Sequence, residues 1–448
     1  MSQAVDATRI PELSDVVSMA LAEARAAGAT QAEADCSLQQ GLNVTVRLGE
    51  VETIEYQRDR ALGITVYFNG AKGSASSADL RPEAVRQMVA KACSIARHTS
   101  RDEFAGLADP ADMASQIPDL DLYHPWDLTP EQAIALAHDC EAAGMAVDAR
   151  ITNSEGATLS THRGVRVYGN SHGFLAGYPS ASHSISCVLL AQDEGGMQRD
   201  YWYTASRVPG ELDDLAQVGR RAGERAVARL GARQLSTRRA PVLFAADMAR
   251  GFFGHLVSAV RGSSQYRRSS FLLDASGEQL LPAFVQMRER PHLRRALASS
   301  PFDAEGVTTR DRELVKDGVL QGYVLGSYSA RKLGLRTTGN AGGIHNLLVE
   351  SSAGALSPAQ MLRQLGTGLY VTEMMGQGVN GVTGDYSRGA SGFWVEGGQI
   401  AYPVHEVTIA GNLRQMYQQV RALGDDVDTH GAIRTGSALV DELTIAGS

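Results

Sequence analysis

In the first hundred residues, hydrophobic positions first recur at helical spacing, then alternate as in strands, and then recur at helical spacing again. This pattern predicts a helix, a run of strands and a second helix. The expected elements are a helix over residues 11–27, strands over 32–39, 42–48, 51–57 and 63–68, and a helix over 82–97. Gly28 is a typical helix end, and Asn69-Gly70 is a typical hairpin turn. Asp79 is expected to cap the second helix.

The same order of elements returns in the next stretch, which indicates an internal repeat. The expected elements are a helix over residues 130–143, strands near 151–160, 164–169, 173–178, 182–191 and 197–205, and a helix over 211–230. Pro110, Pro118 and Pro125, with Pro130 at the start of the next helix, and the lack of a clear period predict an irregular connection. We therefore divide this half into a first unit (1–101), a linker (102–129) and a second unit (130–239).

Glycine becomes frequent after residue 240, and short alternating segments predict a β-rich C-terminal domain over residues 240–448, barrel-like or sandwich-like. Short strands are expected near residues 241–244, 312–315, 320–324, 393–396 and 399–402. Two helices are expected inside this domain, over residues 246–260 and 358–365, the latter with Ser357 as its cap. The predicted fold class is therefore α+β, with two repeated helix/antiparallel-strand/helix units before a glycine-rich β domain.

Composition favours a cytoplasmic globular protein of 448 residues, 43% hydrophobic and 21% charged. The sequence contains no apolar run of the roughly 18 residues that a membrane span needs, and the segment from Met1 to Asp6 does not look like a secretion signal. A net charge of -8 argues against a nucleic-acid partner. The basic run from Arg220 to Arg239 is expected to form a solvated helix face and the exit of that helix. The four widely spaced cysteines are expected to be reduced and buried.

One segment carries the most specific chemistry, Arg250-Gly251-Phe252-Phe253-Gly254-His255, which continues through Ser263-Ser264 to Ser269-Ser270-Phe271-Leu272. It resembles the TldE (PmbA) branch of the TldD/PmbA metallopeptidase family, and the resemblance extends over essentially the whole chain. In the TldD branch this segment reads His-Glu-x-x-x-His, and a cysteine far downstream is the third zinc ligand. Here arginine and glycine replace the first two motif residues, and the last cysteine is Cys187.

Hydrolysis at zinc needs about three protein ligands, a bound water and a nearby carboxylate. His255 alone cannot supply them, so we expect no catalytic residue and no metal site in this chain. The imidazole is expected to face the fixed charge of Arg250 and to be satisfied by a local hydrogen bond. The helix around it is expected to be straighter than one that brings two histidines to a metal.

The resemblance implies a non-catalytic subunit of a peptidase whose zinc belongs to a TldD-type partner. It also implies unfolded peptides as substrates, with leader removal from precursors such as microcins and antitoxin degradation as examples. A homodimer is expected when the partner is absent. A β edge of this chain could hold extended peptide by main-chain hydrogen bonds.

Other polar positions support weaker hypotheses. His345 and Asn346 follow a glycine-rich turn, and Gly378, Asn380 and Gly381 lie in a predicted hairpin region, so these five could contact a peptide or a partner. The carboxylates Glu373, Asp385, Glu396 and Glu406 are too dispersed for a metal site and are expected in ordinary ion pairs or turns. Two alternatives stay open, an independent hydrolase with a rearranged site and a modulator of nucleic acid or gyrase.

Overall fold

A computed structural model describes residues 5–447 of the chain; Met1–Ala4, part of the segment considered for a secretion signal, and Ser448 lie outside the described residues. The N-terminal half contains η1 (Ala7–Arg9), α1 (Ile10–Ala26), β1 (Gln31–Arg47), β2 (Glu50–Phe68), β3 (Ala71–Ser77), α2 (Pro82–His98), η2 (Pro110–Asp112), α3 (Pro130–Met145), β4 (Ile151–Asn170), β5 (Leu175–Asp193), β6 (Gly196–Ser206), η3 (Pro209–Glu211) and α4 (Leu215–Ala228). The predicted repeat is confirmed, since each unit runs helix, three strands, helix.

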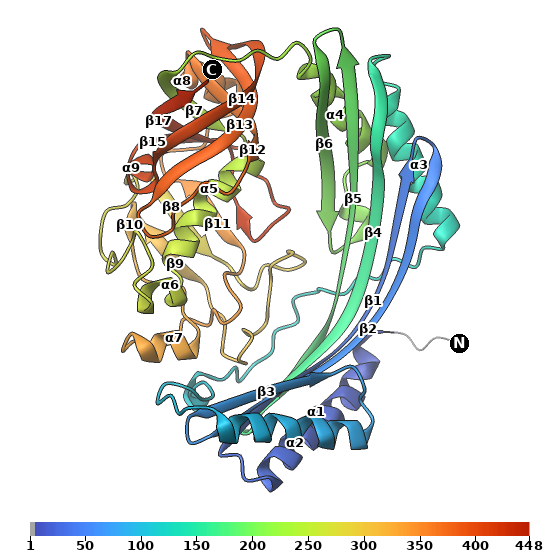
Figure 1. Cartoon of the computed structure of the whole chain (residues 1–448), viewed down its shortest axis with the longest axis vertical. Coiled ribbons are helices and arrows are strands. Elements are labelled where there is room, and N and C mark those ends of the chain that lie inside the picture. Colours follow the sequence, from blue (N-terminus) through green and yellow to red (C-terminus); the bar gives the residue numbers. More distant parts are fainter. Residues whose placement is uncertain (1–4, 448) are drawn as a thin grey trace.

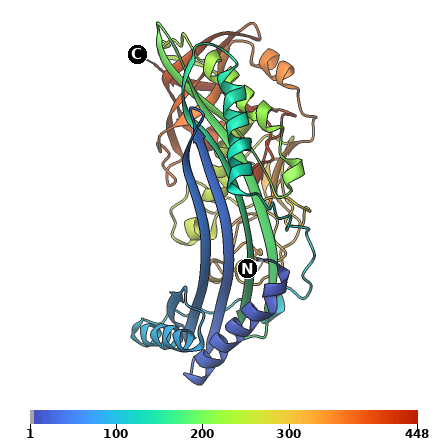
Figure 2. The ribbon, with the colours of Figure 1, turned by 90° about the vertical axis from the view of Figure 1, so that its right-hand side faces the viewer.

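Both units contribute to one antiparallel sheet, in the order β3-β2-β1-β4-β5-β6. Alternate residues of β1 point to the helices: Ala34 and Cys36 pack in the core with α1 and α2, whereas Val44 and Val46 pack in a second core with α3 and α4. Figure 1 shows the two helix pairs at opposite ends of the long curved sheet, and Figure 2 shows the strands running the length of the molecule. The C-terminal half lies against the other face of the sheet (Figure 1).

The predicted short strands of the first half merge into long ones. A break was expected near Gly41, but β1 continues through it because Gly41 pairs with β2 and β4 at once. A Cβ at Gly41 would lie 2.3 Å from His162 Nδ1, so glycine here leaves room for the His162 ring of β4. Strand β3 was not predicted. Asp79 is not the cap of α2, since Arg81 holds that position and the Asp79 carboxylate accepts the Arg81 N–H at 3.0 Å.

The outer edge of β2 is only partly covered. Strand β3 pairs with β2 over Leu62–Phe68, whereas residues 50–61 are exposed on both faces. Tyr56 and Ile54 are among the exposed apolar side chains of this stretch. It is the kind of edge that could pair with extended backbone.

The C-terminal half is built on two sheets around one core. Its elements are β7 (Arg238–Phe244), α5 (Ala246–Ala259), α6 (Gly262–Tyr266), β8 (Val285–Glu289), β9 (Arg312–Lys316), β10 (Val319–Leu320), α7 (Ser327–Lys332), β11 (Leu347–Ser351), α8 (Pro358–Leu365), β12 (Gly368–Met375), β13 (Asp385–Glu396), β14 (Gln399–Asn412), α9 (Leu413–Gln418), β15 (Val420–Leu423), β16 (Ile433–Arg434) and β17 (Ala438–Ala446). One sheet has the order β10-β9-β8-β11-β16 and the other β14-β13-β12-β7-β17-β15. Because β14 also pairs with β17, the second sheet closes into a barrel-like ring. The predicted α+β class with a barrel-like C-terminal sheet is confirmed.

Several local predictions hold in this half. Ser357 caps α8 in a capping box with Gln360. Between the strands predicted near 393–396 and 399–402, Gly397-Gly398 form the tight turn from β13 to β14 with positive φ. The strand expected near residues 320–324 is wrong except at its first residue, because β10 covers only Val319–Leu320. All four cysteines are free and buried, as predicted.

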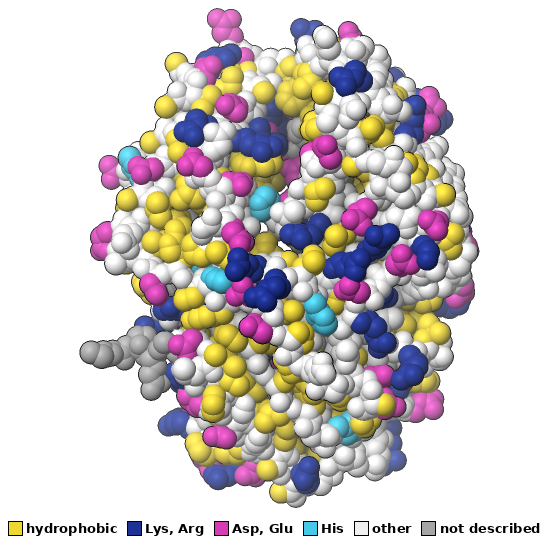
Figure 3. Space-filling model, turned by 180° about the vertical axis from the view of Figure 1, so that it is seen from behind, with side chains coloured by type: hydrophobic (Ala, Val, Ile, Leu, Met, Phe, Trp, Pro, Cys, Tyr) yellow, Lys and Arg dark blue, Asp and Glu magenta, His cyan; other side chains and the backbone are white. Residues whose placement is uncertain are grey.

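The surface mixes both signs of charge. On the face drawn in Figure 3, acidic side chains lie among the basic ones, with apolar side chains between them. Within residues 5–447, no helix is long and apolar enough to cross a membrane.

Candidate functional site

Helix α5 carries the motif and is fixed by aromatic packing. Ala249, Phe252, Phe253 and Leu256 recur on its buried face at helical spacing. The Phe252 ring stacks on Phe244 of β7 at 5.4 Å, and the phenol of Tyr417 donates a hydrogen bond to the Phe252 carbonyl at 3.0 Å. The helix is continuous from Ala246 to Ala259, so the motif residues Arg250 and His255 project from a rigid element.

Arg250 points towards the N-terminal sheet. Its Nη1 lies 3.1 Å from Asp428 Oδ2 and donates to the Tyr203 hydroxyl of β6 at 3.1 Å. Burial disfavours charge on Asp428, but hydrogen bonds from His430 together with Arg250 outweigh burial and lower the pKa of this carboxyl. Position 250 is therefore part of the contact between the two halves of the chain. Gly251 is exposed, with open space where a side chain would stand.

The predicted surroundings of His255 are wrong in two respects. The guanidinium that acts on the imidazole is that of Arg388 on β13, not Arg250, because Arg250 is engaged with Asp428. The expected local hydrogen bond is also missing at one nitrogen, since Nε2 is buried without a partner among residues 5–447. The imidazole meets the Tyr386 ring edge-on at 6.0 Å. Burial, and secondarily Arg388, lower the pKa of His255, so the imidazole is neutral at physiological pH.

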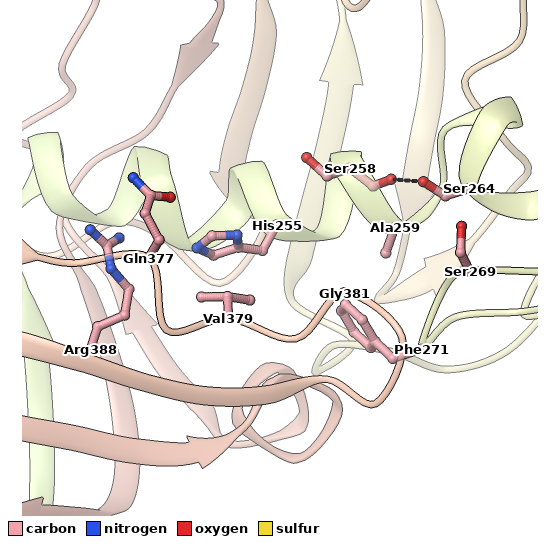
Figure 4. A pocket seen from close by; sticks show the side chains of 10 residues that line it. All are labelled: His255, Ser258, Ala259, Ser264, Ser269, Phe271, Gln377, Val379, Gly381 and Arg388. Atoms are coloured by element: carbon pink, nitrogen blue, oxygen red, sulfur yellow. Dashed lines mark hydrogen bonds between the residues drawn. The ribbon is translucent and has the colours of Figure 1, made fainter.

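A pocket of about 390 Å³ lies beside His255, and we call it the α5 pocket (Figure 4). It is lined by His255, Ser258, Ala259, Ser264, Ser269, Phe271, Gln377, Val379, Gly381 and Arg388. The hydroxyls of Ser258 and Ser264 donate to backbone carbonyls at 2.9 Å, so neither serine is paired with His255 as a nucleophile would be. The pocket thus contains polar groups without an assembled hydrolytic pair.

The donor set does not fit a hydrolytic zinc. Within residues 5–447, no three side chains of His, Cys, Asp or Glu lie together as a metal site requires. His255 is a single imidazole beside the positive Arg388, which repels a divalent cation. No step of a reaction can therefore be derived through a metal at this position.

The glycine-rich turn before β11 is mostly internal. Asn346 is fully buried, and its side chain donates to the Arg290 carbonyl at 2.9 Å and to the Ser299 hydroxyl at 2.7 Å. The backbone N–H of His345 donates to Glu289 at 2.6 Å, and Nε2 of His345 is buried without a partner among the described residues. Both side chains are therefore packed inside the molecule, where they hold the turn in place, and neither lines the α5 pocket.

The predicted hairpin region between β12 and β13 does reach the α5 pocket. Gly381 lines it, and the Gly381 carbonyl accepts the backbone N–H of Phe271 at 2.9 Å. Asn380 is exposed, and its side-chain oxygen accepts the N–H of Val382 at 2.9 Å. A Cβ at Gly378 would lie 1.8 Å from the Ser387 carbonyl, so glycine is required where this loop approaches β13.

Of the dispersed carboxylates, Asp385, Glu396 and Glu406 accept hydrogen bonds from Thr383, Trp394 and Gln234. Glu373 is in an ion pair, as predicted, but in a network that the sequence did not indicate. Glu373 pairs with Arg229, and Arg229 also lies 3.4 Å from Asp200. Arg225 lies 3.0 Å from the same Asp200 carboxylate. Arg221 stacks on Trp202 at 3.5 Å. The predicted solvated face is therefore wrong for Arg225 and for Arg229, just beyond α4, which pack against β6 and β12, whereas Arg220 and Arg221 are exposed.

Arg388, Tyr203 and Asp428 are functional-site residues that sequence analysis missed. Each lies far from the motif along the chain, and each reaches α5 from a different element or loop. A single arginine or tyrosine in a strand carries no signal of such a role. Only the folded arrangement brings them to the helix.

Comparisons with known proteins agree with this architecture. The chain matches three domains of one family: PmbA/TldA metallopeptidase domain 1 (residues 32–96), central domain (123–230) and C-terminal domain (237–447). It is 51% identical to Metalloprotease PmbA of Escherichia coli over 97% of this chain and 96% of that protein. The Metalloprotease PmbA homolog of Haemophilus influenzae is 49% identical over 98% and 96%.

Solved structures share the fold. A Bacteroides thetaiotaomicron protein described as a candidate modulator of DNA gyrase superposes with a TM-score of 0.93 at 25% identity, covering 98% of this chain and 100% of that one. TldE from Thermococcus kodakarensis superposes with a TM-score of 0.84 at 18% identity, covering 96% and 100%. The Metalloprotease TldD homolog of Haemophilus influenzae is 23% identical over 72% of this chain and 73% of that protein.

Proposed function

Because this chain belongs to the PmbA/TldA metallopeptidase family, we propose that it is the non-catalytic subunit of a peptidase whose zinc is held by a TldD-type partner. The observation that carries the proposal is the set of contacts that Arg250 makes. Where the catalytic branch places its first histidine, Arg250 forms an ion pair with Asp428 and a hydrogen bond with Tyr203. The side chain contributes to the contact between the two halves instead of to a metal site.

The remaining features support the same role. His255 keeps one donor of the motif but faces Arg388, and the α5 pocket offers hydroxyl, amide and guanidinium groups that can hold a peptide without cleaving it. The substrates of the assembly are unfolded peptides, including leader segments and an antitoxin, and a homodimer forms when the partner is absent. The similarity to both a TldE structure and a TldD homolog supports this pairing.

The test is to purify the chain alone, the TldD-type homologue alone and the two together, and to measure zinc content and cleavage of an unstructured peptide. We expect the solitary chain to hold no stoichiometric zinc and to cleave nothing, and the pair to be active. His255→Ala and the exposed-histidine control His172→Ala should leave the zinc content of the pair equal. Stoichiometric zinc and cleavage by the solitary chain, both lost in His255→Ala, would favour an independent metallopeptidase and refute the proposal.

A role as a gyrase modulator has less support. The structural neighbour that carries this description shares the fold, but the chain has a net charge of -8, and acidic groups lie among the basic ones on the face in Figure 3. We expect no salt-sensitive DNA binding. A gel-shift titration at low and physiological salt checks this expectation.

A further inference from the structure

The α5 pocket has two polar ends and an apolar middle (Figure 4). Arg388 of β13 and Gln377 of the loop between β12 and β13 form one end, and Ser264 and Ser269 form the other. Between them, Val379 and Phe271 face the helix from the opposite side. The volume of about 390 Å³ lies within the range of about 300–1,000 Å³ that is usual for small-ligand sites.

Arg388 has no carboxylate partner among residues 5–447. Its Nε donates to the Gly376 carbonyl at 3.1 Å, and the Tyr386 phenol is its other polar neighbour. Arg312 of the same half, in contrast, pairs with Glu289 at 2.6 Å. The charge on Arg388 therefore remains uncompensated at the pocket wall, and it attracts an anion.

His255 supplies a second unsatisfied group at the same end. Its Nε2 lacks a hydrogen-bond partner among residues 5–447, although it is shielded from solvent. A buried polar atom without a partner is unfavourable, so a ligand oxygen that reaches it removes a penalty. In Figure 4 the His255 ring faces Val379, and both side chains line the pocket. The two oxygens of one carboxylate can then accept hydrogen bonds from Arg388 and His255.

The apolar middle limits the kind of anion. A phosphate is usually held by several N–H groups and more than one cation, whereas this end has a single guanidinium. An α-carboxylate that is followed immediately by an apolar side chain matches a lone arginine next to Val379 and Phe271. We propose that the α5 pocket binds the free C-terminal carboxylate of a peptide with an apolar last residue, its backbone running along α5 towards Ser269. This rests on the proposed function, which makes peptides the ligands.

The test is isothermal titration calorimetry of the full chain with acetyl-Ala-Ala-Leu as the free acid and as the C-terminal amide. We expect the acid to bind about tenfold or more tightly than the amide, as for the loss of one charge-assisted contact. Arg388→Gln should remove the difference between acid and amide, and Arg388→Lys should keep part of it. Arg363→Gln, an exposed arginine on α8 outside the pocket, is the matched control and should keep the full preference.

Equal binding of acid and amide by the unaltered chain would overturn the proposal, and this result needs no variant. A preference that survives in Arg388→Gln, or inorganic phosphate that binds through Arg388 more tightly than the peptide acid, would overturn it too. The assay uses neither zinc nor the partner. Failure here would therefore leave the non-catalytic role untouched, and peptide cleavage by the solitary chain would refute that role without touching the carboxylate site.

Discussion

Asp200 gives the sharpest test of the buried charge network that lies beside the contact between the two halves. Its carboxylate is 4% exposed and lies 3.0 Å from Arg225 and 3.4 Å from Arg229. These arginines are themselves 19% and 8% exposed, and Arg229 also pairs with Glu373 of β12. Removing the acid leaves two buried positive charges with less compensation.

The substitution Asp200→Asn removes the negative charge and keeps the size of the side chain. The side-chain oxygen of asparagine can still accept the N–H of Tyr201, which Asp200 Oδ1 accepts at 2.7 Å. Breaking a buried pair by removing one partner costs roughly 3–5 kcal/mol. Glu373 still neutralises part of the charge on Arg229, so we expect the lower end, about 3 kcal/mol of unfolding free energy.

The assay is urea denaturation, followed by hydrogen exchange of α4 and β12 to locate the loss. Asp441→Asn is the matched control, because Asp441 is 51% exposed in its pair with Arg421 at 3.4 Å. Such a surface pair contributes about 0–1 kcal/mol. If the two variants lose the same free energy, or if exchange in α4 and β12 is unchanged in Asp200→Asn, the reasoning on this network is refuted.

Three further predictions concern the metal, the packing and the pH dependence. Arg250→His with Gly251→Glu restores two motif residues but not a third ligand, so zinc measured by mass spectrometry should stay below one equivalent; a full equivalent would contradict the analysis of the donor set. Gly219→Ala should destabilise the protein by about 3 kcal/mol or more in a denaturation assay, because its Cβ would lie 1.8 Å from the Cys140 carbonyl, whereas Gly210→Ala, with open space around it, should change little. Burial lowers the pKa of His183, so the unfolded chain binds the proton more readily and the contribution of His183 to stability is lost as the pH falls below about 6.5. The stability difference between the unaltered chain and His183→Asn should shrink over that range, and a constant difference would count against a neutral buried imidazole.

The candidate site was predictable in part. The departure at Arg250 and Gly251 and the surviving His255 were evident from local sequence, because a motif on one helix needs no knowledge of the rest of the fold. The partners of those residues were not predictable. Arg388, Asp428 and Tyr203 belong to different elements, and their side chains meet α5 only after the barrel-like ring closes and packs on the long sheet.

The sequence by itself determined the repeated order of elements, the α+β class, the capped helix at Ser357 and the tight turn at Gly397, since each depends on periodicity or on the backbone preferences of a few neighbouring residues. Strand length was decided by tertiary structure, because β1 runs through Gly41 only when it has neighbours on both sides. The burial of Arg225 in α4 and of Arg229 just beyond it was decided there too, since their acid partners come from β6 and β12. Arg225 and Arg229 meet Asp200 only when α4 packs on the long sheet, and Arg229 meets Glu373 only when the two halves pack together, so no local pattern could predict these partners.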